Sequence, residues 1–356
     1  MKILVLAQDY PDNNGGVTLA YIHTRNIYYS ENGIDVTVLN FSAKTSYIKD
    51  GIRVVSLSEY ELQKESFDIL VLHAANIRNH FRFIKKYGDN FPHFLFFFHG
   101  HEVMRINHDY AKPYEYMKKN IFMYLFQDVY DCYKLYLWRK FIPKMLYKSH
   151  FVFVSYWMRD MFVKNVKITI EQLHNKYSIT YNSVGREFEE STYDEKTEKE
   201  YDFVTIRANL DGSKYAIDIV NKYAHNTPEG RFLVVGKGSI FNHFPKADNI
   251  TWLNMTMSHD EIVRTLNTCR YALMPTRTDA QGLMMCEMAA FGIPVITSNI
   301  PVCHEVFDGF ENAYLVDEDI NLDSFLSMSS RCVKDVRYYK DKTVGHELDI
   351  IRVFEQ

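Results

Sequence analysis

Two series of short apolar runs, separated by a charged stretch, constrain the fold of this chain more than any other feature. In each series the runs carry apolar residues on both faces, and they alternate with segments of helical periodicity. Strands that are buried on both faces are typical of parallel sheets covered by helices. The sequence therefore predicts an α/β chain with two doubly wound, Rossmann-like halves.

The expected strands are short and rich in Val, Ile, Leu and Phe. In the first half they lie at residues 3–7, 35–40, 69–73, 94–99 and 151–155. In the second half they lie at residues 203–207, 232–235, 249–252, 271–275 and 294–297. A helix is expected at 18–30, and the charged stretch 185–200 is the expected interdomain linker.

Length, charge and cysteine content restrict the class of protein. The chain has 356 residues, which is more than one typical domain, and its net charge of −4 gives no argument for nucleic acid as a partner. The five cysteines are scattered, which favours reduced thiols in a cytosol and not a zinc site. With no apolar run of 18 residues and no signal-peptide core near Met1, a cytoplasmic protein is expected.

The stretch from Thr278 to Thr297, TDAQGLMMCEMAAFGIPVIT, reads as a loop, a short helix and a buried strand. Asp279 lies in the loop, and Glu287 follows eight positions later, inside the helix. Gln281 and Gly282 stand where the helix begins, so free backbone N–H groups are expected to point into the loop and to suit a diphosphate. Two acids around an anion site indicate a nucleotide-sugar pocket. An ordinary loop-helix-strand unit of an α/β protein is the alternative.

This stretch resembles the acid-x7-acid signature of retaining glycosyltransferases of the GT-B fold, family 4. In that family the first acid is usually a Glu followed by Gly-Phe-Gly, whereas here Asp279 is followed by Ala-Gln-Gly. The second acid, the two alanines after it and the Gly-x-Pro-Val-Ile run match the family pattern.

The resemblance implies a GT-B fold, in which two Rossmann-like domains face each other across a cleft. Residues 1–190 would form the acceptor domain and 201–335 the nucleotide-sugar donor domain, and 336–356 would be a C-terminal helix that crosses back to the first domain. The implied activity is that of a retaining, hexosyltransferase-like enzyme of surface polysaccharide biosynthesis. Its substrates would be a UDP- or GDP-linked sugar and a glycan or lipid-linked acceptor, and no cofactor and no metal would be required.

The family uses an Arg and a Lys after the first strand of the donor domain, and Arg207 and Lys214 stand there in this chain. Two fixed cations stabilise the leaving diphosphate without a metal. Ile206 replaces the usual Gly, and the gap to Lys214 is longer than in the family. The alternative is a solvated pair of surface charges.

Other donor-site residues follow from the same resemblance. Glu287 would accept the two hydroxyls of a ribose, and Asp279 would face the transferred sugar. A helix N-terminal Glu that only complements the dipole is the alternative for Glu287. Further donor-binding residues are expected at the helix start, in two glycine turns and at a strand end: Gln281, Gly282, Leu283, Gly15, Gly16, Gly236, Trp252 and Leu253. For the glycines, a plain loop or a structural turn is the alternative.

The end of the 94–99 strand is the expected contribution of the first domain. Strand ends line the crevice of such folds, and the family often has a His there, so His99 completes the expected catalytic set with Arg207, Lys214 and Asp279. Glu102 and Arg105 are assigned to the acceptor. The histidines near this position give no closed set of zinc ligands, and no metal site is expected.

Residues 104–150 mix basic with aromatic side chains. This composition suits an anionic membrane surface or a lipid-linked acceptor, which would make the protein peripheral on the inner face of the membrane. A helical insertion packed on the sheet, with its Lys heads in water, explains the composition equally well.

Two other functions fit the same fold. A non-catalytic GT-B partner or glycan-binding protein would have no need of the acids and cations described above. A nucleotide-sugar epimerase usually carries more acids and His in its cleft than this chain provides.

Overall fold

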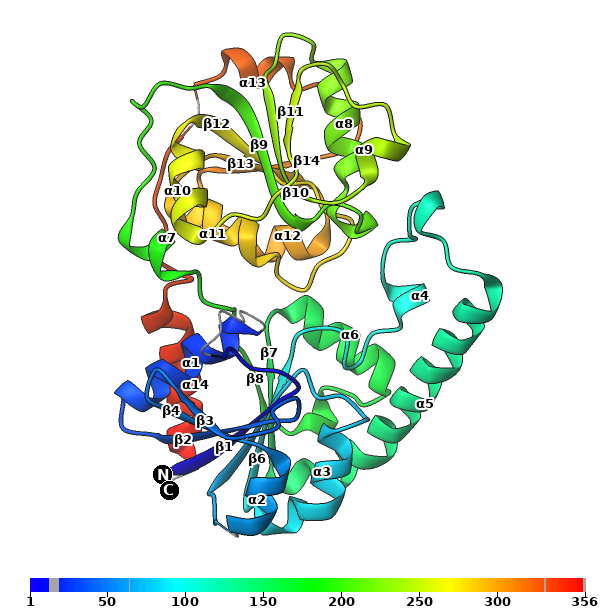
Figure 1. Cartoon of the computed structure of the whole chain (residues 1–356), viewed down its shortest axis with the longest axis vertical. Helices are drawn as coiled ribbons and strands as arrows, with labels where there is room; N and C mark the ends of the chain where they lie inside the picture. The colour runs from blue at the N-terminus through cyan, green and yellow to red at the C-terminus, as the bar shows by residue number, and fades with distance from the viewer. Residues whose placement is uncertain (13–18, 64, 330, 355–356) are drawn as a thin grey trace. The chain divides into compact units, whose positions relative to one another are not determined.

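The computed structural model describes residues 1–12, 19–63, 65–329 and 331–354, and the chain forms two compact units (Figure 1). Unit 1 consists of Met1–Arg105, Asp128–Asn182 and Thr343–Gln356. Unit 2 consists of Ile106–Gln127 and Ser183–Lys342.

Unit 1 is built on an eight-stranded sheet of order β3-β4-β2-β1-β5-β6-β7-β8, in which only the β3–β4 pair is antiparallel among the described residues. Its strands are β1 (Lys2–Ala7), β2 (Asp35–Asn40), β3 (Tyr47–Lys49), β4 (Ile52–Val55), β5 (Ile69–His73), β6 (His93–Phe98), β7 (Ser149–Phe153) and β8 (Tyr177–Ile179). Nearly all residues of the central strands are buried, because helices cover both faces of the sheet.

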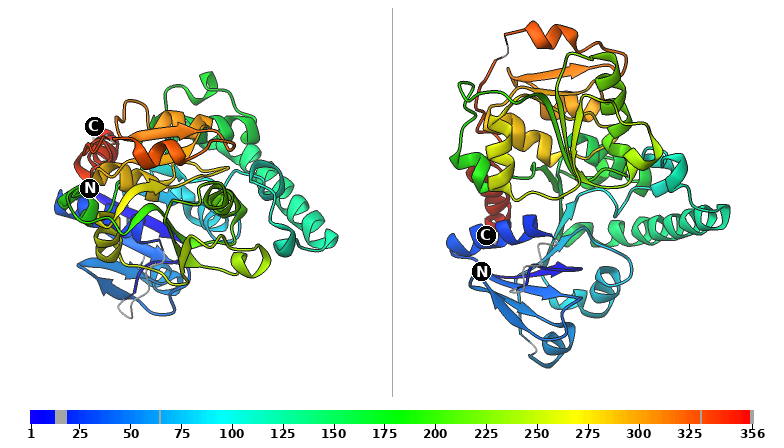
Figure 2. Two further views of the ribbon diagram at one scale, coloured as in Figure 1. Left: turned by 90° about the horizontal axis from the view of Figure 1, so that it is seen from above. Right: turned by 45° about the horizontal axis from the view of Figure 1, so that its top comes forward.

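The helices that belong wholly to unit 1 are α1 (Ala20–Glu31), α2 (Leu57–Gln63), α3 (His80–Tyr87) and α6 (Tyr156–Val166). Two more helices cross the boundary between the units, α5 (Ile121–Met145) and α14 (Lys340–Val353), and α5 is a single continuous helix (Figure 2). Short 3-10 turns lie at η1 (Gly88–Asn90), η3 (Leu146–Lys148) and η4 (Glu171–Leu173).

Helix α14 returns the end of the chain to unit 1. Its Glu347 carboxylate is fully buried and accepts hydrogen bonds from Arg25 at 3.0 and 3.1 Å and from the Tyr29 hydroxyl at 2.5 Å. Val344 and Leu348 join the apolar core of the same unit. A buried charge needs such a partner, so this pairing stabilises the helix against α1.

Unit 2 has a six-stranded, fully parallel sheet of order β11-β10-β9-β12-β13-β14. The strands are β9 (Tyr201–Asn209), β10 (Phe232–Lys237), β11 (Ile250–Leu253), β12 (Cys269–Leu273), β13 (Val295–Ser298) and β14 (Ala313–Val316). Chain order reverses between β9 and β12, and this switch point is where doubly wound sheets bind ligands.

The helices of unit 2 are short. They are α4 (Ile106–Asp109), α7 (Arg186–Glu190), α8 (Ile217–Asn226), α9 (Ile240–His243), α10 (His259–Asn267), α11 (Leu283–Phe291), α12 (Pro301–Val306) and α13 (Asp323–Ser327), with turns η2 (Glu115–Met117) and η5 (Ser213–Tyr215). The side chain of Ser258 caps α10 in a complete capping box with Glu261, which explains where that helix begins.

The division of the chain differs from the expected one in two ways. The segment Ile106–Gln127 belongs to unit 2, because Tyr114 is buried in the apolar core of that unit. The Tyr114 hydroxyl also donates to Asp218 at 2.7 Å. The chain passes from unit 1 to unit 2 at residues 182–183, ahead of the charged stretch. It does so because α7 packs against α10 and α11 of unit 2.

Candidate active site

Arg207 lies at the switch point of the unit 2 sheet. It is near the end of β9, and its Nη2 donates to the carbonyl oxygen of Pro275, just beyond β12, at 3.1 Å. The side chain is 6% exposed, and its Nε has no hydrogen-bond partner among the described residues. Burial lowers the pKa of Arg207, and the nearby Asp279 opposes this effect. A buried donor without a partner is costly, so this position favours an anionic ligand.

Lys214 stands in the turn η5, between β9 and α8. Its Nζ lies 4.6 Å from the centroid of the Tyr215 ring, and Cζ of Arg207 lies 4.9 Å from the same centroid. Within the described part of the chain, no carboxylate pairs with Lys214. Two cations on one ring, neither paired with a carboxylate, create a local positive potential at the carboxyl edge of the sheet.

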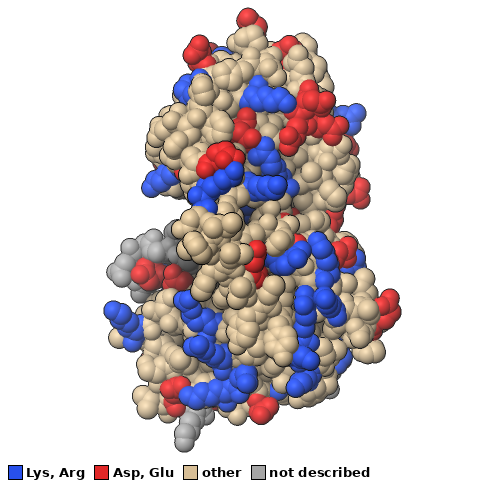
Figure 3. All heavy atoms as spheres, turned by 90° about the vertical axis from the view of Figure 1, so that its right-hand side faces the viewer, with Lys and Arg blue, Asp and Glu red and all other residues tan. Residues whose placement is uncertain are grey.

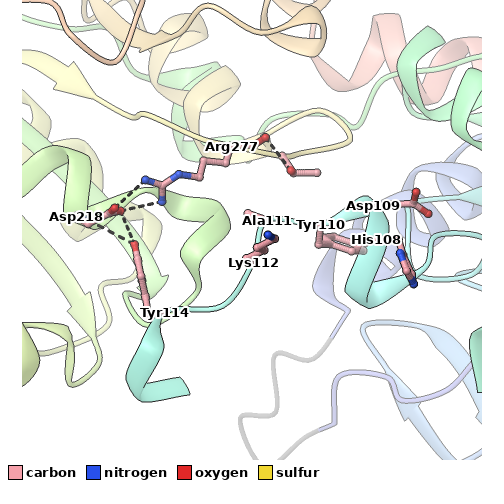
Figure 4. A pocket seen from close by; sticks show the side chains of 9 residues that line it. His108, Asp109, Tyr110, Ala111, Lys112, Tyr114, Asp218 and Arg277 are labelled. Carbon is pink, nitrogen blue, oxygen red and sulfur yellow. Dashed lines mark hydrogen bonds and ion pairs between the residues drawn. The ribbon is translucent and has the colours of Figure 1, made fainter. Parts of the chain in front are cut away.

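Arg277 holds the loop of Lys214 against the loop that follows β12. The Arg277 backbone N–H donates to the Lys214 carbonyl oxygen at 2.8 Å, and the Thr276 hydroxyl donates to the same oxygen at 3.0 Å. The Arg277 guanidinium forms two hydrogen bonds, at 2.8 and 2.7 Å, with Asp218 (Figure 4). Burial opposes ionisation of Asp218, but these bonds and that from Tyr114 keep its pKa below the ordinary value.

The acid loop ends at the start of α11. Gly282 has a φ of 75° and precedes the first helical residue, and Oδ1 of Asp279 accepts the Ala280 N–H at 2.8 Å. The N–H groups of Leu283 and Met284 have no acceptor among the described residues. Free N–H groups at a helix N-terminus carry partial positive charge and can bind a phosphate.

Glu287 is buried on the first turns of α11, with 3% of its surface exposed. Its Oε1 accepts the backbone N–H of Gly185 at 3.0 Å and lies 4.0 Å from Nε2 of His259. Burial raises the pKa of Glu287 to about 7, although His259 and the Gly185 N–H oppose the shift. A Cβ at Gly185 would lie 2.7 Å from the His259 ring, so a larger residue there would require the His259 side chain to shift.

Gly236 has a structural function next to Arg207. Its φ is 154°, and a Cβ there would lie 2.2 Å from the Arg207 carbonyl oxygen. The register of β10 on β9 shifts at this point. The indole N–H of Trp252 donates to the Gly236 carbonyl at 3.1 Å, and Leu253 ends the same strand, β11. The glycine therefore allows β10 to pass close to the residue that carries the guanidinium.

His99 lies in unit 1, beyond the end of β6. Its Nε2 is 3.3 Å from Nδ1 of His73, and its ring centroid is 4.9 Å from that of Tyr21. Burial, with a smaller contribution from Arg25, lowers the pKa of His99 to about 3, so the ring is neutral at physiological pH.

Glu102 closes the loop that follows His99. Its two carboxylate oxygens accept the backbone N–H groups of His99 at 2.6 Å and Gly100 at 2.7 Å, and the residue is 3% exposed. Burial raises the pKa of Glu102 against the effect of these bonds. Arg105 is half-buried and is the last residue before the chain crosses into unit 2. Gly15 and Gly16 lie outside the described residues.

Unit 2 also contains two cavities beside the Lys214 loop, each of about 570 Å³. The first, shown in Figure 4, is lined by His108, Asp109, Tyr110, Ala111, Lys112, Tyr114, Asp218, Arg277 and Thr278. The second combines apolar residues with Lys112, Lys118, Lys119 and Lys214. Among the described residues, no group of three or more His, Cys, Asp or Glu side chains could hold a metal ion.

Sequence reasoning did not single out Tyr215, Arg277, His259 or Gly185. Arg277 stands two positions before Asp279, but its contact with Lys214 joins residues 63 positions apart. Gly185 and His259 meet Glu287 from the linker and from α10. The only sequence signal at His259 is the capping serine before it.

Solved structures show the same fold over the whole chain. Sucrose-phosphate synthase from Thermosynechococcus elongatus superimposes with a TM-score of 0.72 at 12% identity, covering 99% of each chain. The lipopolysaccharide outer core galactosyltransferase WaaB does so with a TM-score of 0.64 at 13% identity, also covering 99% of each chain. At this identity the likeness shows the fold alone, and it confirms the expected GT-B class.

Sequence comparisons place a glycosyltransferase signal in unit 2. Residues 203–335 match the family described as Glycosyl transferases group 1. The chain is also 29% identical over 177 residues to the O-antigen chain mannosyltransferase RfbU of Salmonella typhimurium, which is 47% of this chain and 47% of that protein. This match thus spans about half the length of the relative. Together these findings support a group 1 glycosyltransferase.

Proposed function

We propose that this protein transfers a sugar from a nucleotide-sugar donor to a hydroxyl group of a glycan or lipid-linked acceptor, with retention at the anomeric carbon, as a family 4 hexosyltransferase. The observation that carries the proposal is the buried guanidinium of Arg207 at the switch point, with its unpartnered Nε in the described structure. The second cation, Lys214, shares the Tyr215 ring with it and has no carboxylate partner among the described residues.

The diphosphate of the donor would lie between these two cations and the free N–H groups of Leu283 and Met284. When the bond between the sugar and the diphosphate breaks, negative charge develops on the leaving phosphate. Fixed cations and helix N–H groups stabilise that charge without reorganisation, and in a buried site they act more strongly than in water. The chain's own residues thus supply the stabilisation that other transferases take from a metal ion.

The remaining donor contacts follow from the positions around α11. The carboxylate of Glu287 would accept ribose hydroxyls, and Asp279, on the adjacent loop, would face the sugar. The base of a uridine or guanosine nucleotide would lie near the ends of β10 and β11, at Gly236, Trp252 and Leu253. A ribose-binding carboxylate must be ionised, so its pKa of about 7 makes donor binding sensitive to pH.

The acceptor would be bound by Glu102 and Arg105 of unit 1, and His99 of the same unit would complete the catalytic set with Arg207, Lys214 and Asp279. A neutral His99 can donate or accept a hydrogen bond with a sugar hydroxyl. The RfbU relative is an O-antigen chain mannosyltransferase, and this supports an acceptor of surface polysaccharide biosynthesis. A lipid-linked acceptor would place the protein at the inner face of a membrane, and peripheral location there is part of this proposal.

The test is a thermal-unfolding series with UDP, GDP and their sugars, run in EDTA and again with magnesium. A nucleotide at about 100 times its dissociation constant stabilises the folded state by about 2.7 kcal/mol. We expect stabilisation by one nucleotide class in EDTA, and loss of that stabilisation in Arg207→Gln. Arg264→Gln, an exposed cation on α10, is the matched control and retains the response. If no nucleotide stabilises the wild type, the donor site is absent and a non-catalytic partner becomes the better assignment.

A further inference from the structure

Helix α5 exposes apolar side chains on its outward side although it also buries Leu135, Trp138 and Ile142 on its inward side. Its inward side buries Asp131 and Lys134, which form an ion pair at 2.8 Å, and Lys134 also donates to the carbonyls of His101 and Met104. Its outward side is apolar. A helix on the surface of a globular protein usually presents charged residues to water and apolar residues to the core.

Five of the exposed apolar residues of α5 recur every three or four positions, so they form one stripe along the helix. They are Phe122, Phe126, Val129, Tyr133 and Tyr136, between 54% and 78% exposed, and Ile121, Met123 and Leu125 beside them are also more than half exposed. A patch of this kind is rare on soluble monomers and marks an interaction surface. Tyrosine in the stripe is notable because its ring is apolar and its hydroxyl is polar, as in the interfacial belts of membrane proteins.

Basic residues continue and flank the stripe. Lys140 and Lys144 follow Tyr136 at helical spacing and are exposed. Within unit 1, a groove of about 520 Å³ between α3 and α5 is lined by apolar side chains, by Tyr130 and Tyr133, and by four exposed cations, Arg78, Arg82, Lys85 and Lys86. Figure 3 shows rows of Lys and Arg side chains on the face turned toward the viewer.

The groove cations are available to an external anion. Lys86 pairs with Glu61 at 2.9 Å, but no described residue forms an ion pair with Arg78, Arg82 or Lys85. The only carboxylates on α5 are those of Asp128 and the buried Asp131. The apolar stripe is thus bordered by uncompensated positive charge.

We propose that the outward stripe of α5 and the cationic groove between α3 and α5 bind the surface of an anionic lipid bilayer. The aromatic and aliphatic side chains would enter the boundary between headgroups and acyl chains, and the cations would contact lipid phosphates. The helix would lie on the membrane, since no described helix is long and apolar enough to cross one. This inference rests on the peripheral location included in the proposed function and names the surface that would make the membrane contact, whereas it does not depend on the sugar-transfer reaction.

The charge distribution disfavours a second copy of the chain as the occupant. Two α5 helices paired in antiparallel fashion would place the aromatic half of each against the Lys140 and Lys144 half of the other. A parallel pair would place each lysine against its own copy. In both arrangements cations would face apolar groups or like charges, which an interface avoids. An anionic lipid layer instead complements both the apolar stripe and the cations.

The test is sedimentation of the whole protein with vesicles of phosphatidylcholine, with and without added phosphatidylglycerol. The wild type is expected to bind the anionic vesicles and to dissociate at high salt. Each Lys or Arg near a membrane surface contributes about fivefold to partitioning, so Arg78→Gln/Arg82→Gln/Lys85→Gln is expected to lower it about a hundredfold. The control with the same change of charge, Lys167→Gln/Lys222→Gln/Arg264→Gln, retains more binding.

Phe122→Ser/Phe126→Ser tests the apolar part, and Leu62→Ser, at an exposed leucine of α2, is its control. The double variant is expected to lose vesicle binding, and Leu62→Ser to keep it. Circular dichroism establishes that each variant is folded. If an α5 or groove variant does not fold, Lys140→Gln/Lys144→Gln is tested in its place. The proposal is overturned if the wild type does not prefer anionic vesicles or if the α5 variants bind like their controls. It is also overturned if the stripe instead holds a dimer that Phe122→Ser/Phe126→Ser dissociates.

Discussion

The backbone N–H of Arg277 donates to the carbonyl oxygen of Lys214 over 2.8 Å, and this contact joins the loop that carries the Lys214 cation to the loop that carries Asp279 of the candidate donor site. One loop follows β9 and the other follows β12, so the hydrogen bond spans the switch point of the unit 2 sheet. Because the Arg277 side chain is held by Asp218, the position of Lys214 depends on a residue that would not touch the nucleotide.

Replacement of Arg277 by Gln is therefore expected to weaken nucleotide binding about tenfold through Lys214. It removes the charge-assisted bonds to Asp218, worth about 1 kcal/mol or more at a partly exposed site. Calorimetric titration of the preferred nucleoside diphosphate measures the change. In a Lys214→Ala background the same substitution should have little further effect, because the group that it positions is gone. Additive losses in the double variant would show that Arg277 does not act through Lys214.

Substitution of Arg207 by Gln tests the leaving-group role. Loss of one preorganised donor to a developing oxyanion typically lowers kcat about 10²–10³-fold. We expect a fall of that size in the initial rate of sugar transfer, with a smaller change in KM for the donor. Arg264→Gln serves as the control for a lost surface charge. An unchanged kcat would show that Arg207 stabilises the end of the sheet and takes no part in the reaction.

Gly236→Ala is expected to destabilise the protein by about 1–3 kcal/mol, because the new Cβ would overlap the Arg207 carbonyl oxygen and force β10 away from β9. Urea denaturation followed by circular dichroism measures this loss. Gly345→Ala, where a Cβ meets nothing closer than 3.6 Å, should be neutral or stabilising in its helix. Equal stability of the two variants would contradict the close approach at Arg207.

The stability of the protein should depend on pH through Glu287. Burial raises its pKa from 4.5 to about 7 in the folded state, so the folded protein holds a proton that the unfolded chain has already released. The favourable contribution is complete below pH 4.5 and is lost as the pH rises through 7. Glu287→Gln removes this dependence, and its advantage over the wild type should grow by up to about 3 kcal/mol between pH 5 and 8.

Denaturation at both pH values measures that difference, with the exposed Glu229→Gln as the control. Nucleotide affinity should show the opposite trend. It is expected to rise with pH through 7 in the wild type, where the ribose needs an ionised carboxylate, and to stay flat in Glu287→Gln. Parallel stability curves for wild type and Glu287→Gln would place the pKa of Glu287 near its ordinary value.

The sequence predicted most of the buried strands well because these strands consist mainly of apolar residues. β1, β2 and β5 are apolar on both faces, and the expected ranges agree with the observed ones within a residue. It did not predict β3, β4, β8 or β14, which have only three or four residues each. Of these, β3, β8 and β14 are edge strands with half-exposed side chains. Such strands exist through pairing with a neighbour, and pairing leaves no periodic pattern in a short segment.

The same distinction applies to the units and to the site. Spacing and residue type determined the α/β class and the order of the motifs, since helix starts, glycine turns and apolar runs are local signals. The candidate donor residues came from the resemblance of those motifs to a family pattern. Only the tertiary structure decided that Tyr114 carries its segment into unit 2, that Arg207 and Lys214 share one ring, and that Glu287 is buried beside Gly185. These contacts join residues far apart in the chain, and they depend on the order in which the strands assemble, which no local pattern records.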